Sequence, residues 1–204
     1  KNAIAEVVKN HPLCVLVTRK KNGGKGKALA DGVRKADELG LTHVLQIDSD
    51  GQHDAERVAH FVEVSKKNPE AIICAYPEYD ESAPKHRVNG RTIANAWIHT
   101  VTLSKQIKDG MIGFRIYPVA PYVKLLNSHV IIDARMGYDI DILVRLFWKN
   151  VPVICESVKV TYPVDGVSNF RLVRDNARIS LTYARLFLGM IVRLPILIFR
   201  KIKG

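Results

Sequence analysis

Cysteine is scarce in this 204-residue sequence, and its pattern excludes a disulfide framework. Only three cysteines occur, at Cys14, Cys74 and Cys155, an odd number without paired spacing. Each lies in an apolar run, so we interpret them as small buried side chains in a reducing compartment rather than as disulfide partners or zinc ligands. Zinc-finger spacing, an RNP-like aromatic motif and internal repeats are also absent, which argues against a nucleic-acid partner. Lys1 begins no secretory signal and suggests a processed or truncated product.

Long apolar runs are missing as well. The most apolar late segment, Leu186–Phe199, has 14 residues and includes Arg193 and Pro195. A membrane span needs about 20 apolar residues. We therefore expect this segment to lie in a membrane interface, and an ordinary core helix is the alternative.

Acidic residues are few towards the C-terminus. The whole chain has 31 Lys and Arg against 20 Asp and Glu, a net charge of +11, which favours an anionic partner. Residues 166–204 contain a single acid, Asp175, and eight cations: Arg171, Arg174, Arg178, Arg185, Arg193, Arg200, Lys201 and Lys203. Because these cations alternate with Leu, Ile, Phe and Met, the pattern is more typical of a helix on an anionic lipid surface than of a nucleic-acid binder.

Short apolar segments alternate with helical patterns along the chain. The expected strands are Leu13–Val17, His43–Ile47, Ala71–Tyr76, Gly113–Tyr117 and Val151–Tyr162. The expected helices are 25–39, 55–67, about 88–104, 138–148 and about 172–203, the last with a kink or break at Pro195. This alternation predicts an α/β fold with a mainly parallel sheet flanked by helices.

An acidic cluster directly follows the second expected strand, in the sequence Asp48-Ser49-Asp50-Gly51-Gln52-His53. Ligands in open α/β sheets gather at the carboxyl ends of strands, where this cluster lies. Asp48 and Asp50 can share a hard cation such as Mg²⁺ or Mn²⁺, which in turn holds phosphate oxygens. A surface turn rich in Asp and Gly is the alternative.

A basic, glycine-rich turn, Asn22–Lys27, joins the first expected strand to a helix. Its glycines permit close backbone approach, and the helix N-terminus favours an anion. It is not a P-loop, because the spacing differs and no Ser or Thr follows Lys25. An ordinary turn is the alternative.

Two more carboxylates, Asp139 and Asp141, fall near the start of an expected helix. Either can serve as a general base that removes a proton from an acceptor hydroxyl. The helix dipole also favours carboxylates at this position, so a stabilised first turn is the alternative.

Taken in this order, the motifs resemble those of the family 2 glycosyltransferases, which have the GT-A fold. The most similar branch contains the dolichyl-phosphate and polyprenyl-phosphate sugar transferases. The family's Asn-x-Gly-Lys-Gly matches at Asn22, Gly24, Lys25 and Gly26. Its Asp-x-Asp-Gly-Gln-His matches at Asp48, Asp50, Gly51, Gln52 and His53. Its acceptor-side motif matches at Asp109, Gly113, Phe114 and Arg115, and its Glu-Asp motif matches in part, with Tyr138 in place of Glu, followed by Asp139, Asp141, Arg145 and Leu146.

The resemblance implies an inverting transfer of a single sugar from a nucleotide-sugar donor to a lipid-linked or membrane-proximal acceptor, with a role in the cell envelope. It implies Mg²⁺ or Mn²⁺ at Asp48 and Asp50. The implied donor-side residues are Asn22, Gly24, Lys25, Gly26, Asp48, Gln52 and His53. The implied catalytic residues are Asp139 and Asp141, and the implied acceptor-side residues are Arg87, Arg91, Asp109 and Arg115. Arg87 and Arg91, one helical turn apart, can grip a phosphate or simply form a solvated basic face.

Two departures from the family shape the expected organisation. We expect the strands that hold the nucleoside in this family to be absent, because their pattern does not occur at the start of the sequence, and the signature of processive synthases is absent, which favours transfer of one sugar. We expect an incomplete catalytic domain at 1–170 and a basic amphipathic helical tail at 171–204, peripheral at the cytoplasmic face of the membrane. Without those strands the nucleoside has no pocket, so weak donor binding is expected. The alternatives are an inactive membrane-associated fragment and a sugar-nucleotide nucleotidyltransferase.

Overall fold

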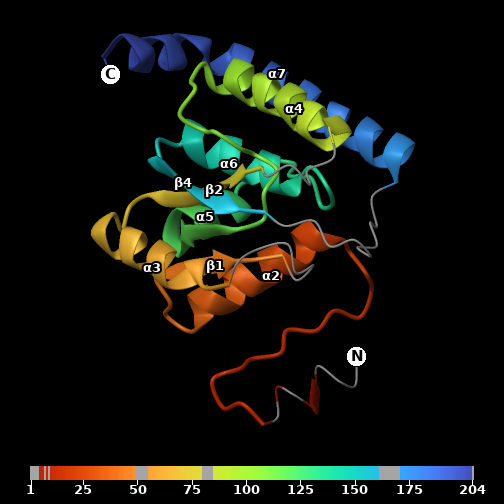
Figure 1. Cartoon of the computed structure of the whole chain (residues 1–204), viewed down its shortest axis with the longest axis vertical. Helices are drawn as coiled ribbons and strands as arrows, with labels where there is room; N and C mark the ends of the chain where they lie inside the picture. Colours follow the sequence, from red (N-terminus) through yellow and green to blue (C-terminus); the bar gives the residue numbers. More distant parts are fainter. Residues whose placement is uncertain are drawn as a thin grey trace.

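Helices and strands alternate along most of the chain. A computed structural model describes residues 5, 6, 8, 10–48, 55–79, 85–160 and 171–203, with the side chains of all of these except residues 85–87, 172 and 203. The elements are α2 (Lys25–Glu38), β1 (His43–Gln46), α3 (Arg57–Lys67), β2 (Ile72–Glu78), α4 (Lys85–Thr102), β3 (Arg115–Pro118), α5 (Val119–Leu126), α6 (Tyr138–Trp148), β4 (Val153–Lys159) and α7 (Leu172–Lys203). Figure 1 shows them in chain order.

The four strands form one mixed sheet in the order β1-β3-β2-β4. β3 is antiparallel to both β1 and β2, whereas β2 and β4 are parallel, with Cys74 opposite Cys155. β1, β2 and β4 therefore run in one direction, and β3, which lies between β1 and β2, runs in the opposite direction. The predicted α/β class with flanking helices is confirmed, and the inserted β3 makes two of the three strand pairings antiparallel.

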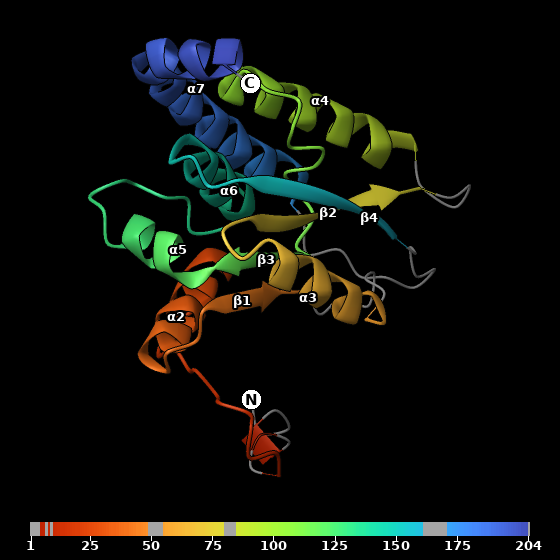
Figure 2. The ribbon, with the colours of Figure 1, turned by 90° about the vertical axis from the view of Figure 1, so that its left-hand side faces the viewer.

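Each face of the sheet carries its own hydrophobic core, because successive strand residues point to opposite faces. Along β2, Ile72 and Cys74 enter one core and Ile73 enters the other. The larger core lies under α6, and α4 and α7 pack on α6 and on each other. α3 covers the opposite face (Figure 2), where the Phe61 ring stacks on Phe114 with centroids 4.4 Å apart. This layering brings the C-terminal end of β1 and the first residue of β3 close to the start of α6.

The expected strand at Leu13–Val17 is wrong. These residues form no strand, and Leu13 is 97% exposed. A strand needs a neighbour for its backbone N–H and C=O groups, and an apolar run alone does not specify one. Cys14, expected to be buried, is exposed for the same reason, whereas Cys74 is buried, Cys155 is half-buried, and all three thiols are free.

Two helical features also differ from expectation. The eight-residue α5 has no counterpart among the expected helices. Pro121 lies in its first turn, where the missing backbone N–H of proline costs little. Of the kink or break expected at Pro195, the break is wrong, because Pro195 lies inside a continuous α7 of 32 residues.

α7 has two apolar stripes. One stripe is buried against α4 and α6 and contains Ile179, Tyr183, Leu186, Met190 and Leu197. The other is exposed and contains Leu188, Val192, Ile196, Phe199 and Ile202. By length and composition alone, Val173–Ile202 is also long and apolar enough to cross a membrane: an 18-residue stretch within it has a mean hydropathy of 1.7, and 28% of that stretch is buried. The segment Leu186–Phe199 is thus partly a core helix and partly exposed.

Candidate active site

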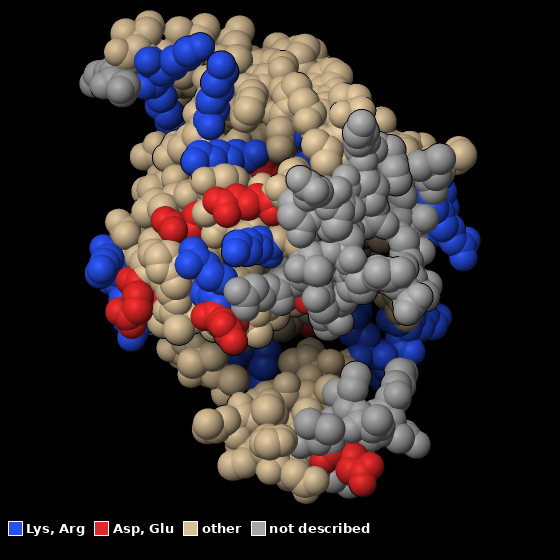
Figure 3. Space-filling view, viewed as in Figure 1, with Lys and Arg blue, Asp and Glu red and all other residues tan. Residues whose placement is uncertain are grey.

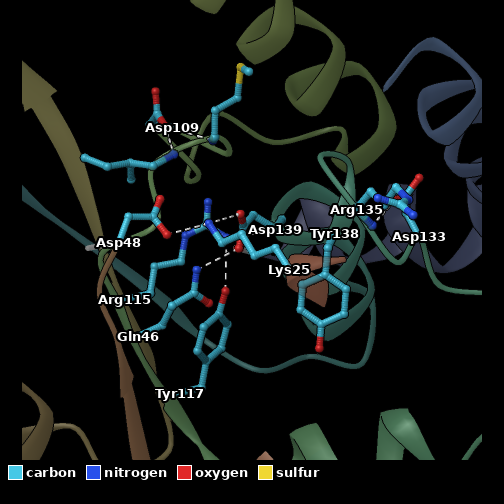
Figure 4. Close-up of polar contacts among 12 residues, drawn as sticks. Lys25, Gln46, Asp48, Asp109, Arg115, Tyr117, Asp133, Arg135, Tyr138 and Asp139 are labelled. Atoms are coloured by element: carbon cyan, nitrogen blue, oxygen red, sulfur yellow. Dashed lines mark hydrogen bonds and ion pairs between the residues drawn. The ribbon is translucent and has the colours of Figure 1, made fainter. Parts of the chain in front are cut away.

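Three motifs that lie far apart in sequence meet at one lysine. Lys25 begins α2, Asp48 follows β1, and Asp139 lies in the first turn of α6. The Lys25 Nζ lies 2.6 Å from Asp48 Oδ1 and 2.8 Å from Asp139 Oδ2. Burial by itself lowers the pKa of Lys25, but the two neighbouring carboxylates outweigh it and raise that pKa overall. The ammonium therefore stays charged between two carboxylates (Figure 4).

The carboxylate of Asp139 is held from the sheet side as well. Gln46, the last residue of β1, donates from its amide to Asp139 Oδ1 at 2.8 Å. Arg115, fully buried on β3, donates from one terminal nitrogen to the Asp139 backbone carbonyl at 2.8 Å and to the Tyr117 hydroxyl at 3.0 Å. Asp139 is only 5% exposed. These contacts fix both the backbone and the side chain of this residue.

The glycines of the basic turn fit against the protein itself. The Asn22 side chain accepts from the Gly24 amide, and Gly24 has a φ of 89°, which favours glycine. A Cβ at Gly24 would lie 2.4 Å from the Ala134 carbonyl oxygen, and a Cβ at Gly26 would lie 2.4 Å from the Tyr138 ring. The Gly26 amide donates to the same Ala134 carbonyl at 3.0 Å. The turn is thereby docked on the segment that precedes α6.

Asp141 and Tyr138 face away from Lys25. The Asp141 carboxylate is fully buried, accepts from the Asp133 amide at 2.8 Å and is paired with Arg145. Burial raises the pKa of Asp141 despite the opposing charge of Arg145. The Tyr138 hydroxyl accepts from the Tyr122 hydroxyl at 2.9 Å, and burial raises the pKa of Tyr138 to about 12. Of these residues at the start of α6, Asp139 is therefore the one that joins the cluster around Lys25.

A small pocket lies at the C-terminal end of β2, beside α4. Its volume is about 110 Å³, and its polar lining includes Tyr76, Arg91, Thr92, Asn95, Lys108 and Asp109. Asp109 is buried and accepts from the Met111 and Ile112 amides, while its other oxygen lies 3.4 Å from Arg91 Nε. The Lys108 Nζ lies 4.2 Å from the centre of the Tyr76 ring. Two cations thus line this pocket.

Six of the expected site residues within the described chain fall into two groups, and Asn22, Gly24, Gly26 and Asp141 belong to neither. Lys25, Asp48 and Asp139 share one cluster with Arg115, and Arg91 shares the pocket with Asp109. Arg115, expected on the acceptor side, lies behind Asp139 instead (Figure 4). Asp50, Gln52 and His53, and the side chain of Arg87, lie outside the described residues.

Several contributing residues were not identified from the sequence. Gln46 has a usable signal: it is a polar residue in an apolar strand, two positions before Asp48 and therefore on the same face. Lys108 directly precedes a matched motif residue, Asp109. Tyr117 and Asp133 carry no such signal, since their roles come from tertiary contacts alone.

Gly113, which belongs to the acceptor-side motif, lies directly against the Asp48 carboxylate. A Cβ at this position would lie 2.1 Å from Asp48 Oδ2. We expect Gly113→Ala to lower kcat/KM for the sugar transfer that the sequence predicts about a hundredfold, because a misplacement of roughly 1 Å has an effect of that order. Steady-state kinetics together with thermal unfolding test this. Gly90→Ala is the matched control, because no atom lies within 4 Å of its added Cβ. Equal kinetics in the two variants would contradict the prediction.

Comparison with known proteins identifies a family and a fold. The family model described as glycosyl transferase family 2 matches residues 1–142. No curated protein matches the chain. Similar solved structures include glucosyl-3-phosphoglycerate synthase from Mycobacterium tuberculosis in complex with phosphoglyceric acid, with a TM-score of 0.57 at 14% identity. The same enzyme in complex with Mn²⁺, uridine-diphosphate-glucose and glycerol 3-phosphate gives a TM-score of 0.56 at 14% identity.

Both alignments cover 84% of this chain and 56% of the other, so the chain spans little more than half the length of these structures. At this identity the likeness shows a shared GT-A-like fold. The family model matches well over half of the sequence and includes the Lys25, Asp48 and Asp139 cluster. The chain therefore belongs to glycosyl transferase family 2.

Proposed function

We propose that this chain transfers a single sugar, with inversion, from a nucleotide-sugar donor to a phosphate-bearing acceptor at a membrane surface. The observation that carries the proposal is the ammonium of Lys25 between Asp48 and Asp139, on the fold of family 2. A carboxylate on the donor-metal side and a carboxylate poised as a base are the two groups that such a reaction uses. The uridine-diphosphate-glucose named in a similar structure supports this donor class.

The chemistry of Asp48 suits a divalent cation. Its side chain is 30% exposed, and carboxylate oxygens are the hard ligands that Mg²⁺ and Mn²⁺ prefer. Within the described residues, no group of three or more His, Cys, Asp or Glu side chains gathers to hold a metal. We propose Asp48 and Asp50 as the protein ligands, with Gln52 and His53 in support, as the motif match implies. When bound, the metal neutralises charge on the leaving diphosphate.

Asp139 is the proposed base. Gln46 and Lys25 donate to its two oxygens and hold the side chain in place, and a carboxylate is one of the groups that act as a general base. It takes the proton of an acceptor hydroxyl as that oxygen attacks the anomeric carbon; an ionised phosphate acceptor needs no such step. Asp141 is proposed as a structural partner, because both of its oxygens are engaged away from Lys25.

The pocket beside α4 is proposed to take the phosphate of the acceptor. Arg91 and Lys108 supply positive charge, and Thr92 and Asn95 supply neutral polar groups. Charge-assisted contacts of this kind are the usual means of holding phosphate. Phosphoglyceric acid and glycerol 3-phosphate, named in the similar structures, are phosphate-bearing compounds, which supports this acceptor class. A lipid phosphate of the cell envelope fits the same chemistry and the basic, apolar α7.

The exposed stripe of α7 is proposed to lie on the cytoplasmic face of an anionic membrane. Figure 3 shows Lys and Arg atoms beside uncharged surface at the C-terminal end of this helix. Arg185, grouped with the lipid-facing cations in the sequence, points instead to Asp133 at 3.7 Å. The division into a catalytic part at 1–170 and a tail at 171–204 stays a proposal.

Loss of either pocket cation should raise the KM for acceptor. We expect Arg91→Gln and Lys108→Gln each to raise it by about tenfold or more, because a hydrogen bond to a charged group contributes roughly 1.5–3 kcal/mol. The donor KM should stay unchanged. Steady-state kinetics with varied acceptor measure both constants. Lys105→Gln removes a nearby exposed cation outside the pocket lining and is the matched control. An unchanged acceptor KM in both pocket variants would contradict this assignment.

One experiment separates the proposed function from its rivals. The intact protein is incubated with uridine-diphosphate-glucose, Mn²⁺ and a polyprenyl phosphate in anionic vesicles, and the products are analysed by NMR. Release of nucleoside diphosphate with a β-linked sugar, from the α-linked donor, is expected. A retained α linkage would overturn inversion. Pyrophosphate release from nucleoside triphosphate and sugar 1-phosphate would identify a nucleotidyltransferase. If the protein catalyses neither of these reactions, the result would support an inactive membrane-binding protein.

A further inference from the structure

The segment between α5 and α6 is clamped from two sides by polar contacts centred on Asp133. Its Oδ2 accepts from the Thr182 hydroxyl of α7 at 3.0 Å and lies 3.7 Å from an Arg185 nitrogen. Its Oδ1 accepts from the Arg135 amide, and its own amide donates to Asp141 of α6. Thr182 is fully buried, so its hydroxyl depends on these protein partners.

Ala134, the residue after Asp133, contacts the basic turn Asn22–Lys27. The carbonyl of Ala134 accepts from the Gly26 amide at 3.0 Å and would contact a Cβ at Gly24 at 2.4 Å. Lys25 lies between these two glycines. The backbone position of Lys25 is therefore set by the carbonyl of Ala134, the residue that directly follows Asp133.

α7 also packs against the residue that precedes α6. A Cβ at Gly137 would lie 2.6 Å from the Thr182 hydroxyl oxygen and 3.3 Å from the Asp133 carboxyl carbon. Gly137 precedes Tyr138 and Asp139, so the same two side chains that fix the 133–135 segment also touch the end of α6 that carries the proposed base. Asp133 and Thr182 thus help to hold the backbone near both partners of the Lys25–Asp139 ion pair.

We propose that Asp133 is a positioning residue for the transfer reaction: together with Thr182 it fixes the Ala134 carbonyl, and through it Lys25, relative to Asp139. This inference rests on the proposed function only for its kinetic consequence. Asp133 lies in the same close-up as the cluster, beyond Tyr138 (Figure 4), and acts through the backbone without joining the cluster itself. α7 is therefore part of the framework of the active site.

The test uses two near-isosteric variants, Asp133→Asn and Thr182→Val, in the intact protein. Asp175→Asn and Thr102→Val are the matched controls, since both replace buried polar side chains away from the 133–137 segment. Hydrogen exchange is followed for the peptide that contains residues 22–30. We expect exchange at least about tenfold faster in the two test variants, because loss of the clamp releases the Gly26 amide locally. The controls should exchange there as the wild type does.

Kinetics provide the second readout. The donor KM should rise at least about tenfold, whereas the acceptor KM should stay within about twofold, since none of residues 133–137 lines the proposed acceptor pocket beside α4. Unchanged exchange and donor KM in both test variants, or equal changes in the controls, would overturn the proposal. Faster exchange in a protein whose wild type transfers no sugar would uphold the positioning contact and refute the proposed function, so the two failures are distinguishable.

Discussion

Asp48→Asn is expected to lower kcat for sugar transfer by about a thousandfold or more. A metal at a leaving diphosphate contributes several kcal/mol to the transition state, and each 1.4 kcal/mol corresponds to a factor of ten. Asn keeps the shape of the side chain but removes the charge that binds the metal and pairs with Lys25 at 2.6 Å. Lys25 keeps its second partner, Asp139, so the fold should persist.

Activity and Mn²⁺ binding are measured together, by nucleoside-diphosphate release and by calorimetry. Asp37→Asn is the control, because Asp37 is exposed and lies near the end of α2, away from the cluster. Turnover of Asp48→Asn at the wild-type rate, or full activity in EDTA, would refute the metal assignment.

Asp139→Asn should lower the rate of sugar transfer between about a hundredfold and ten-thousandfold if a hydroxyl acceptor needs a base.

The second large effect concerns the exposed stripe of α7. We expect the triple variant Leu188→Ser, Val192→Ser and Ile196→Ser to lower partitioning onto phosphatidylglycerol vesicles at high salt by at least about a hundredfold. Full burial of one such side chain is worth roughly 1.5–3 kcal/mol, and tenfold in affinity is about 1.4 kcal/mol. Deleting residues 186–204 is a poorer test, because it removes the buried Leu186, Met190 and Leu197.

Co-sedimentation at low and high salt measures this effect. At low salt the variant should keep part of its binding, since each basic residue near an anionic surface contributes about 1 kcal/mol and salt screens that attraction. Leu41→Ser, which replaces an exposed leucine far from α7, is the control. If the intact wild type ignores anionic vesicles at low salt, the membrane proposal is wrong.

Local sequence patterns predicted most helices and strands of the fold. The helix at 138–148 was predicted with the bounds that α6 has, because apolar residues follow one face and two acids mark its first turn. The same reasoning failed at Leu13–Val17, where an apolar run has no strand beside it. The antiparallel placement of β3 between β1 and β2 was not predictable, since strand order depends on tertiary packing and not on the pattern of a single segment.

The site shows the same division. The convergence of Lys25, Asp48 and Asp139 was predictable in outline, because strand ends and helix starts in an α/β fold meet at one edge of the sheet. The contact of Gly26 with the Tyr138 ring was not, because the glycine-rich turn suggested room for a ligand and the room is taken by the protein. The role of Asp133 depends on α7, which lies some fifty residues further along the chain.

The lysine between the two carboxylates also sets the charge balance of the site. The Lys25 ammonium and the two carboxylates that contact it sum to one negative charge, which would favour a divalent cation. With such a cation bound, these three side chains and the metal would together carry one net positive charge, which would favour a diphosphate. Without Lys25 the same metal would only neutralise the pair. The charge of a single side chain at the start of α2 would therefore favour binding of the metal before the donor anion.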